Sequence, residues 1–569
     1  MVKTILFVLS LVCLFSHPIA HAQTPAAEVA RQADVLQRQS EERIQRDIDQ
    51  AIRERPAPQV APVIPTPRVD ASAAGPSCHQ IDSIDIQGAP HLSAKAREDI
   101  GRRYAQRCLG VAEIEAILAE ITRDYIERGY ITTRAYLPSQ DLSRGRLEIL
   151  VVEGVIGTIE LRDGGTGSIR PGLVFPAEGE LLNLRDFEQG IEQLNRLSSN
   201  NVQLDIQPGD APGSSRVLII NEPTRPLHAM IGADNYGSDS TGRNQLSFSL
   251  SADRLLGLNE LMIYTHRRSQ PYDSQRRASS ADSFSFLLPL GYSTLSASVF
   301  ASRYATGVTT PNGTPLRFHG DSDGYNLRLQ RVVYRDGGTR AVLSTGLAGK
   351  SSRNYLEDEL LGVSSRRLTL FDVEASASAR VAGGAASGAL AYVRGLSMLG
   401  ALRDAADLPG DAPHAQFGKL HYEFSWFRPL QLGSVNAEFS TQWSGQWTRQ
   451  ALYGSEQQLI GGVYSVRGFS KSTLSGDSGW YARNEIAWRP TLEAAGQLLP
   501  LRLYAGFDLG AVSNQAAGVP GGHLRGVALG VAGSMRRLSF DFFHARALSQ
   551  PDFLPREGSQ TWLRLNLAI

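Results

Sequence analysis

Two short segments in the carboxy-terminal half of the chain carry residues that could form a charge pair. Residues 461–469 hold Arg467 within a long connection rich in Gly and Ser, and residues 506–510 hold Asp508 among small residues. A guanidinium can bind a carboxylate through two parallel hydrogen bonds, which would fix one segment against the other. From spacing alone, a solvated Asp508 without such a partner is the simpler alternative.

Other motifs that would indicate an enzyme or a metal site are incomplete. Residues 346–351 end like a phosphate-binding loop, but Ser344 stands where the first glycine is required. Residues 321–324 begin like a calcium loop that lacks the later glutamate, so a solvated loop is the better interpretation. The 11 histidines form no H-x-x-x-H pair, and no Gly-x-Ser-x-Gly segment occurs. The sequence therefore predicts no enzyme activity, no cofactor and no metal site.

Composition narrows the class of protein further. The chain has 57 Lys and Arg against 57 Asp and Glu, so it lacks the basic excess typical of nucleic-acid-binding proteins, and we expect no nucleic-acid partner. Hydrophobic residues make up 42% of the 569 residues, which excludes wholesale disorder. Glycine is frequent, at 55 residues, and this favours a β-rich chain with many turns.

The amino terminus predicts export from the cytoplasm. A basic residue precedes an apolar run over residues 5–15, and an Ala-His-Ala cleavage site follows, so residues 1–22 are interpreted as a signal peptide. Only Cys78 and Cys108 remain after cleavage, and in an exported protein they are expected to form one disulfide. These two cysteines and their neighbours offer too few ligands for a zinc ion.

Residues 23–55 predict a helix with a narrow apolar stripe. Apolar residues recur at helical spacing, while charged side chains cover the remaining faces. Such a helix can lie in water as a spacer or in a polar cavity, but it cannot nucleate a core of its own. Residues 56–77 contain six prolines and predict an extended, semi-rigid linker.

Two compact α+β units are predicted to follow the linker. Residues 78–153 show the order β-α-α-β-β, with helices expected over 93–107 and 111–128. Residues 154–223 repeat this element order more weakly, with one marked helix around Phe187. The repetition rests on element order only.

Residues 224–569 alternate apolar and small polar residues over short segments separated by turn residues. This period of two, continued up to Leu567 and Ile569, is typical of an antiparallel transmembrane β-barrel, for which the length gives about 16 strands. A soluble β-sandwich or a propeller is the alternative, but no internal repeat supports a propeller. Around Asp508, alternation places Tyr504, Gly506 and Gly510 in the lumen with it and Phe507 on the lipid side.

Taken together, these segments resemble the TpsB-type outer-membrane transporters of two-partner secretion, the haemolysin secretion and activation proteins. Residues 129–140 and 152–154 resemble that family's first POTRA domain, and the Cys78–Cys108 spacing also fits it. The tip motif of the sixth extracellular loop resembles Val466, Arg467, Gly468 and Phe469, and the lumenal strand motif resembles Gly506, Phe507, Asp508 and Gly510. The terminal Ile569 departs from the family, in which an aromatic residue is usual.

The resemblance implies an architecture and a function. Residues 23–55 would be a plug helix, 78–153 and 154–223 two periplasmic POTRA-like domains, and 224–569 a barrel in the outer membrane of a Gram-negative bacterium. Arg467 and Asp508 would pair inside the pore. The implied function is export of a large unfolded exoprotein with an N-terminal secretion domain, related to haemolysins, haemagglutinins or other adhesins, to the cell surface.

Outer-membrane lipid and, during biogenesis, the barrel-assembly machinery are the other implied partners. The implied function includes activation of a haemolysin-like partner. An outer-membrane insertase is the alternative function, although insertases usually carry more POTRA units and no plug helix. An outer-membrane enzyme would need a catalytic set that the sequence does not offer.

Overall fold

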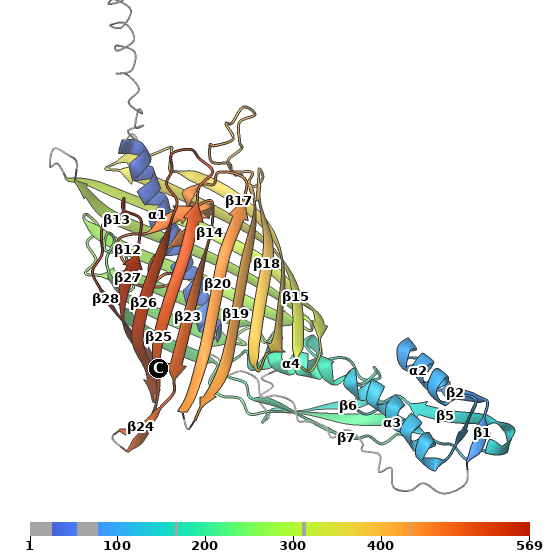
Figure 1. Ribbon diagram of the computed structural model, residues 1–569. Helices are drawn as coiled ribbons and strands as arrows, with labels where there is room; N and C mark the ends of the chain where they lie inside the picture. Colours follow the sequence, from blue (N-terminus) through green and yellow to red (C-terminus); the bar gives the residue numbers. More distant parts are fainter. Residues whose placement is uncertain (1–24, 54–77, 165–168, 310–314, 434, 495) are drawn as a thin grey trace, which may run out of the picture.

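The computed structural model describes residues 25–53, 78–164, 169–309, 315–433, 435–494 and 496–569. The predicted signal peptide, residues 1–22, and the predicted linker, residues 56–77, lie outside these described residues. The described chain forms two α+β units attached to one end of a large β-barrel, with a helix inside the barrel (Figure 1).

The first α+β unit packs two helices against a small sheet. Its elements are β1 (His79–Ile81), β2 (Ser83–Gln87), α2 (Ala94–Tyr104), β3 (Arg107–Leu109), α3 (Val111–Glu127), β4 (Arg134–Tyr136) and β5 (Arg146–Val152). The sheet order is β2-β5-β4, and β1 pairs separately with β3. Ser93 caps α2 by accepting a hydrogen bond from the Ala96 amide, and Gly129 follows α3 with a φ of 98°, which favours glycine. The predicted first strand is thus two strands.

The second unit differs from the predicted repeat. Its elements are β6 (Val155–Arg162), a 3₁₀ turn (Pro171–Leu173), α4 (Leu184–Asn195), β7 (Val202–Pro208) and β8 (Ser214–Asn221), with sheet order β6-β8-β7. Among the described residues it has one α-helix, because a proline-initiated 3₁₀ turn stands where the first helix of a β-α-α-β-β repeat would lie. Phe187 is fully buried on α4 and anchors the core of this unit.

Sixteen antiparallel strands close into a barrel, which confirms the predicted fold. The barrel strands are β9 (Leu227–Asp234), β10 (Asn244–Asp253), β11 (Leu261–Gln270), β12 (Arg277–Leu290), β13 (Ser293–Thr309), β14 (Pro315–Arg335), β15 (Thr339–Leu356), β17 (Arg366–Val381), β18 (Gly384–Leu396), β19 (Gly418–Leu432), β20 (Val435–Thr448), β23 (Ser478–Trp488), β25 (Gln497–Ser513), β26 (Gly522–Met535), β27 (Leu538–Ser549) and β28 (Gln560–Ala568). Short strands β16 (Glu359–Leu360), β21 (Gln458–Ile460), β22 (Leu474–Gly476) and β24 (Thr491–Ala494) lie in the connections.

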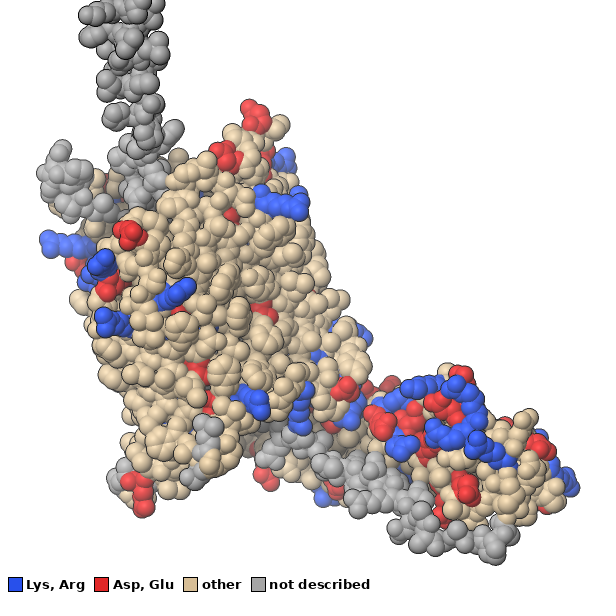
Figure 2. Space-filling view, in the orientation of Figure 1, with Lys and Arg blue, Asp and Glu red and all other residues tan. Residues whose placement is uncertain are grey.

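Alternation along each strand separates an apolar outer face from a polar lumen. Figure 2 shows this outer face as a broad surface almost free of charged side chains, which gather toward its two ends. The barrel closes where β28 pairs with β9, with Leu567 opposite Ile231. The terminal Ile569 continues this seam by donating its amide to the Ala229 carbonyl at 2.8 Å.

The second α+β unit is fixed to the barrel through α4 and the nearby strand ends. The Gln193 side chain donates to the Thr294 hydroxyl at 3.0 Å, and Tyr292 donates to Asp186 at 2.6 Å. Arg335 at the end of β14 forms an ion pair with Glu192 at 2.5 Å. We call the end of the barrel that bears these contacts the domain end, and the opposite end the distal end.

Helix α1 (Pro25–Arg53) runs through the barrel lumen (Figure 1). Ala33, Leu36 and Ile44 on its narrow apolar stripe are buried, and charged side chains on its other faces contact the barrel wall. Of the two settings open to this sequence, water or a polar cavity, the structure therefore has the second. No helix among the described residues is long and apolar enough to cross a membrane.

Candidate functional site

The structure brings Arg467 and Asp508 into direct contact inside the barrel. Nε and Nη2 of Arg467 donate to the two carboxylate oxygens of Asp508 at 2.6 and 2.8 Å, and the Arg467 backbone amide donates at 3.0 Å. Both side chains are buried, with 1% and 0% of their surface exposed. The solvated, unpaired Asp508 is therefore not what the structure has.

Two further charged residues that the sequence analysis missed extend this pair. Nη1 of Arg467 donates to Glu485 on β23 at 2.6 Å, and Glu485 also accepts from Arg502 on β25 at 2.7 Å. Glu485 lies outside every recognisable motif. Period-two alternation on β23 was the available signal, because the strand register pairs Arg483 with Asp508 and so directs Glu485 to the same lumenal face.

Glycines make room for the guanidinium and its loop. A Cβ at Gly506 would lie 2.2 Å from Nη2 of Arg467, and one at Gly526 would lie 1.8 Å from the Arg467 carbonyl oxygen. Gly468 has a φ of 101°, and a Cβ there would lie 2.5 Å from the Arg546 backbone on β27. Any larger residue at these positions would clash with Arg467 or with the neighbouring backbone, which explains why small residues stand there.

The remaining motif residues separate into two environments. Val466 and Phe469 are fully buried in an apolar cluster with Ile460, Tyr481 and Leu524, which holds the loop tip against the lumenal wall. A Cβ at Gly510 would lie 3.2 Å from a methyl carbon of Val466. Phe507 points away from this site, with 45% of its surface exposed on the outer face, as alternation predicts.

The connection that carries Arg467, residues 449–477, is hereafter called loop 6. Its tip has a second anchor on the side that faces the distal end of the barrel. Glu557, in the connection between β27 and β28, accepts hydrogen bonds from the amides of Ser470 at 2.8 Å and of Lys471 at 3.0 Å. It also accepts from the Ser472 amide at 2.5 Å. Burial acts to raise the pKa of Glu557, but these backbone amides outweigh it and hold the pKa below its usual value.

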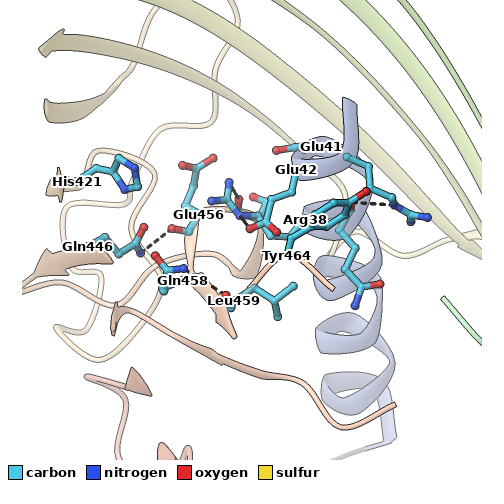
Figure 3. A network of polar contacts seen from close by, with 12 residues as sticks. Arg38, Glu41, Glu42, His421, Gln446, Glu456, Gln458, Leu459 and Tyr464 are labelled. Atoms are coloured by element: carbon cyan, nitrogen blue, oxygen red, sulfur yellow. Dashed lines mark hydrogen bonds and ion pairs between the residues drawn. The ribbon is translucent and has the colours of Figure 1, made fainter. Parts of the chain in front are cut away.

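Helix α1 and loop 6 meet in a buried polar network. Lys350 on β15 lies between two carboxylates, with Nζ at 2.9 Å from Glu41 of α1 and at 2.9 Å from Glu456 of loop 6. Lys419 on β19 forms a second ion pair with Glu456 at 3.0 Å. Figure 3 shows Glu456 between the barrel wall and the helix face that carries Arg38, Glu41 and Glu42. Lys350 of the barrel wall therefore forms ion pairs with both α1 and loop 6.

Two further contacts tie α1 to the barrel and to loop 6. Toward the distal end, Asp34 forms an ion pair with Arg366 at 3.1 Å, and the Arg366 guanidinium lies 4.3 Å from the ring centre of Tyr453. Toward the domain end, the Arg46 guanidinium lies 4.4 Å from the ring centre of Tyr464 in loop 6. None of these α1 residues stands in a recognisable motif, so their pairing could not be read from the sequence.

Cavities remain around the helix. A cavity of about 1210 Å³ lies at its distal end beneath the loops, and one of about 650 Å³ follows its side. A third, of about 610 Å³, opens in the domain half and includes Ser376, Glu423 and Gln442 in its lining. The lumen is therefore polar along its length and only partly filled.

Other candidate residues fall outside this site. Residues 346–351, which end like a phosphate-binding loop, lie within β15. The interpretation of residues 321–324 as a solvated loop is wrong, because they lie inside β14. Cys78 and Cys108 are joined as a disulfide beside the β1–β3 ladder, far from the lumen in sequence and fold.

The first α+β unit places its motif residues at the contact with the second. A Cβ at Gly129 would lie 2.2 Å from Asn183, and one at Gly154 would lie 1.9 Å from Thr132. Beside them, Glu153 accepts hydrogen bonds from Tyr125 at 2.5 Å and from the His91 amide at 3.0 Å. These glycines therefore permit close packing where the two units join.

A closed sixteen-stranded barrel with an apolar outer face, a polar lumen holding an ion-paired loop and helix, and two α+β units at one end defines an outer-membrane transporter with two POTRA domains. The barrel lies in the outer membrane and the POTRA domains lie in the periplasm, so the domain end is periplasmic and the distal end extracellular.

Comparison with known proteins supports this class and narrows it. The family model described as haemolysin secretion/activation protein ShlB/FhaC/HecB matches residues 213–533, and POTRA models match residues 79–154 and 155–208. The chain belongs to this haemolysin secretion/activation family of two-partner secretion transporters. The predicted family, fold and location are thereby confirmed.

Individual relatives cover between 78% and 97% of the chain. The outer membrane transporter CdiB of Dickeya dadantii is 34% identical over 571 residues, covering 97% of this chain and 96% of its own. The hemolysin transporter protein ShlB of Serratia marcescens is 32% identical over 445 residues, covering 78% of each. The solved structure of CdiB from Escherichia coli is 32% identical, covers 94% of this chain and 98% of its own, and superposes with a TM-score of 0.84.

Proposed function

We propose that this transporter captures a large, unfolded exoprotein in the periplasm and conducts it through the barrel lumen to the cell surface. The observation that carries the proposal is how the lumen is closed. Helix α1 fills it through ion pairs such as Asp34–Arg366 and Glu41–Lys350, while polar cavities remain on both sides of the helix. A closure held by side-chain charges can be released without unfolding the barrel wall.

The POTRA domains supply a means of capture. Their three-stranded sheets end in the edge strands β2 and β4 in the first domain and β6 and β7 in the second. An extended chain can add to such an edge by backbone hydrogen bonds, which suits recognition of an unfolded segment of varied sequence. The partner we propose is an exoprotein with an N-terminal secretion domain, related to haemolysins or haemagglutinins, which transport would also activate.

Loop 6 supplies a fixed element of the pore. The Arg467–Asp508 pair, completed by Glu485, holds its tip against the lumenal wall while α1 leaves. The loop tip thereby keeps the wall in shape around the moving chain.

Site-specific photo-crosslinking of a stalled exoprotein tests the proposal. Ser376 lines the cavity of about 610 Å³ in the domain half of the lumen, so a crosslinker at this position should capture the exoprotein. A crosslinker at Val373, on the outer face of the same strand, should not. Both positions lie on β17, so expression and insertion are matched. Absence of crosslinks at Ser376, or equal crosslinking at both positions, would contradict passage through the lumen.

A further inference from the structure

The outer face of the barrel carries a band of charged residues toward its extracellular end, on strands β12 to β17. We call this set the outer charged band, and its members are Asp282, Arg303, Asp321, Asp323, Arg353 and Arg367. The strand register sets Arg303 opposite Asp321 and Asp321 opposite Arg353.

The band ends at a sharp boundary with the apolar belt. On β12 and β14 the next outward residues toward the periplasm are Phe284 and Tyr325. On β13 and β17 the first large outward residues are Val299 and Phe371, one outward position further along. These four side chains have 39–53% of their surfaces exposed. Side chains of this kind face the hydrocarbon region, with aromatic residues at its edges. The outer charged band therefore lies at the level of the lipid headgroups of the outer leaflet.

Within the band, one arginine is fixed and two remain available. Arg353 forms an ion pair with Asp321 at 2.5 Å and lies 3.8 Å from Asp323. Neither Arg303 nor Arg367 forms an ion pair within the described part of the chain. Arg303 lies on β13, which β14 separates from β15, whereas Arg353 and Arg367 lie on the directly paired strands β15 and β17.

We propose that the outer charged band binds the phosphate groups of the phosphorylated glycolipid of the outer leaflet. Arg303 and Arg367 are the direct phosphate ligands, because a guanidinium binds phosphate through two parallel hydrogen bonds. Arg353 is the third arginine of the band, and its ion pairs with Asp321 and Asp323 fix its position. The band as a whole holds three aspartates and three arginines, so the choice of occupant rests on Arg303 and Arg367. Their charge is complementary to phosphate, and the hydrocarbon below the band offers no partner for a cation.

Native mass spectrometry of the full-length transporter in phosphatidylcholine nanodiscs tests this inference, with bisphosphorylated lipid A as the probe. The variant Arg303→Gln/Arg367→Gln should retain lipid A at least about tenfold less than the unchanged protein, because charge-assisted bonds to phosphate are the strong ones. It leaves the Arg353 ion pairs in place. The control is Arg331→Gln, which removes an exposed arginine from the periplasmic end of β14 and should leave lipid A binding unchanged.

Three results would overturn the inference. The first is equal lipid A binding by the double variant, after heat-dependent electrophoretic mobility has shown that its barrel is folded. The second is equal binding of dephosphorylated lipid A, which would mean that the acyl chains alone are recognised. The third is displacement of lipid A by inorganic phosphate or by an equal amount of phosphatidylglycerol, which would mean that the band accepts any anion.

Discussion

Loop 6 and helix α1 occupy the same lumen but are held in it by different chemistry. The loop tip is fixed by a fully buried, forked contact between Arg467 and Asp508 and by glycines shaped to it. Helix α1 is held by longer ion pairs, at 3.1 Å to Arg366 and 2.9 Å to Lys350, beside cavities that water can enter. The first arrangement suits a permanent part of the wall and the second suits a part that leaves. The predictions below test this difference, beginning with the largest expected effect.

Removing either member of the forked pair should have the largest effect. Arg467→Ala or Asp508→Ala leaves a buried charge without its partner, which costs about 3–5 kcal/mol. We expect each substitution to reduce exoprotein secretion severely and the double variant to lose less than the sum of both, as measured by secretion and by barrel assembly in the outer membrane.

Arg525→Ala is the matched control for this pair, because Arg525 is exposed on the outer face of neighbouring β26. It should secrete normally. Arg467→Lys separates charge from geometry, since lysine keeps the charge but cannot form the fork, and it should remain impaired. Strictly additive losses, or full secretion by both alanine variants, would mean that the two residues do not act as a unit.

Deleting residues 25–53 should change conductance more than secretion. The deletion removes α1 from the lumen but leaves the contacts of Arg467 with Asp508 and Glu485 intact. Planar-bilayer recordings should therefore show a larger and more persistent ion conductance, while secretion remains possible. Unchanged conductance would indicate that α1 does not close the pore.

Neutralising the two acidic contacts of α1 should give a smaller change in the same direction. Asp34→Asn/Glu41→Gln removes the charges that face Arg366 and Lys350, so openings should become more frequent without change in their size. Glu42→Gln is the control, because Glu42 pairs with Arg38 of the same helix, at 3.2 Å. If Glu42→Gln opens the pore as often as the double variant, the charge contacts between α1 and the barrel wall are not what retains the helix.

The smallest effect is expected at the distal anchor of loop 6. Because the pKa of Glu557 is lower in the folded state than its unfolded value of about 4.3, its stabilisation is complete above that pH and is lost as the pH falls through the folded pKa. A spin label at Lys471→Cys should become more mobile on acidification. Glu557→Gln should raise the mobility at neutral pH and remove its dependence on acid.

Asp552→Asn provides the comparison for this anchor, because Asp552 is exposed in the same connection. It should leave both the label mobility and its pH dependence unchanged. A label that stays equally ordered in Glu557→Gln would mean that the lumenal pair alone fixes the loop tip.

The same difference in chemistry explains what could be predicted from the sequence. Alternation along the strands predicted the barrel and its outer and lumenal faces, and the glycines around Arg467 and Asp508 marked a site that needs close approach. Lys350, Glu456 and Glu41 gave no such signal, because a single ion pair requires no special backbone and can form between any facing positions. Glu485 was missed because no motif marks it, although alternation along β23 places it on the lumenal face. Glu557 was missed because it lies 87 residues along the chain from Ser470, which it contacts.

The secondary structure of residues 321–324 was also misjudged from the sequence. Asp321 and Asp323 begin a segment that resembles an incomplete calcium loop, which is why residues 321–324 were expected to form a solvated loop. In the structure they continue the strand, because their side chains face outward beyond the apolar belt, where charge is tolerated. Polarity therefore marks the edge of the membrane here and not the end of the strand.

The position of Glu557 between the last two strands imposes an order on maturation. Its carboxylate can receive the amides of Ser470, Lys471 and Ser472 only after the β27–β28 hairpin has formed. The Gly468 contact with the Arg546 backbone on β27 has the same requirement. A barrel that has not completed its final hairpin therefore lacks the distal anchor of loop 6, even where Arg467 already contacts Asp508 on β25.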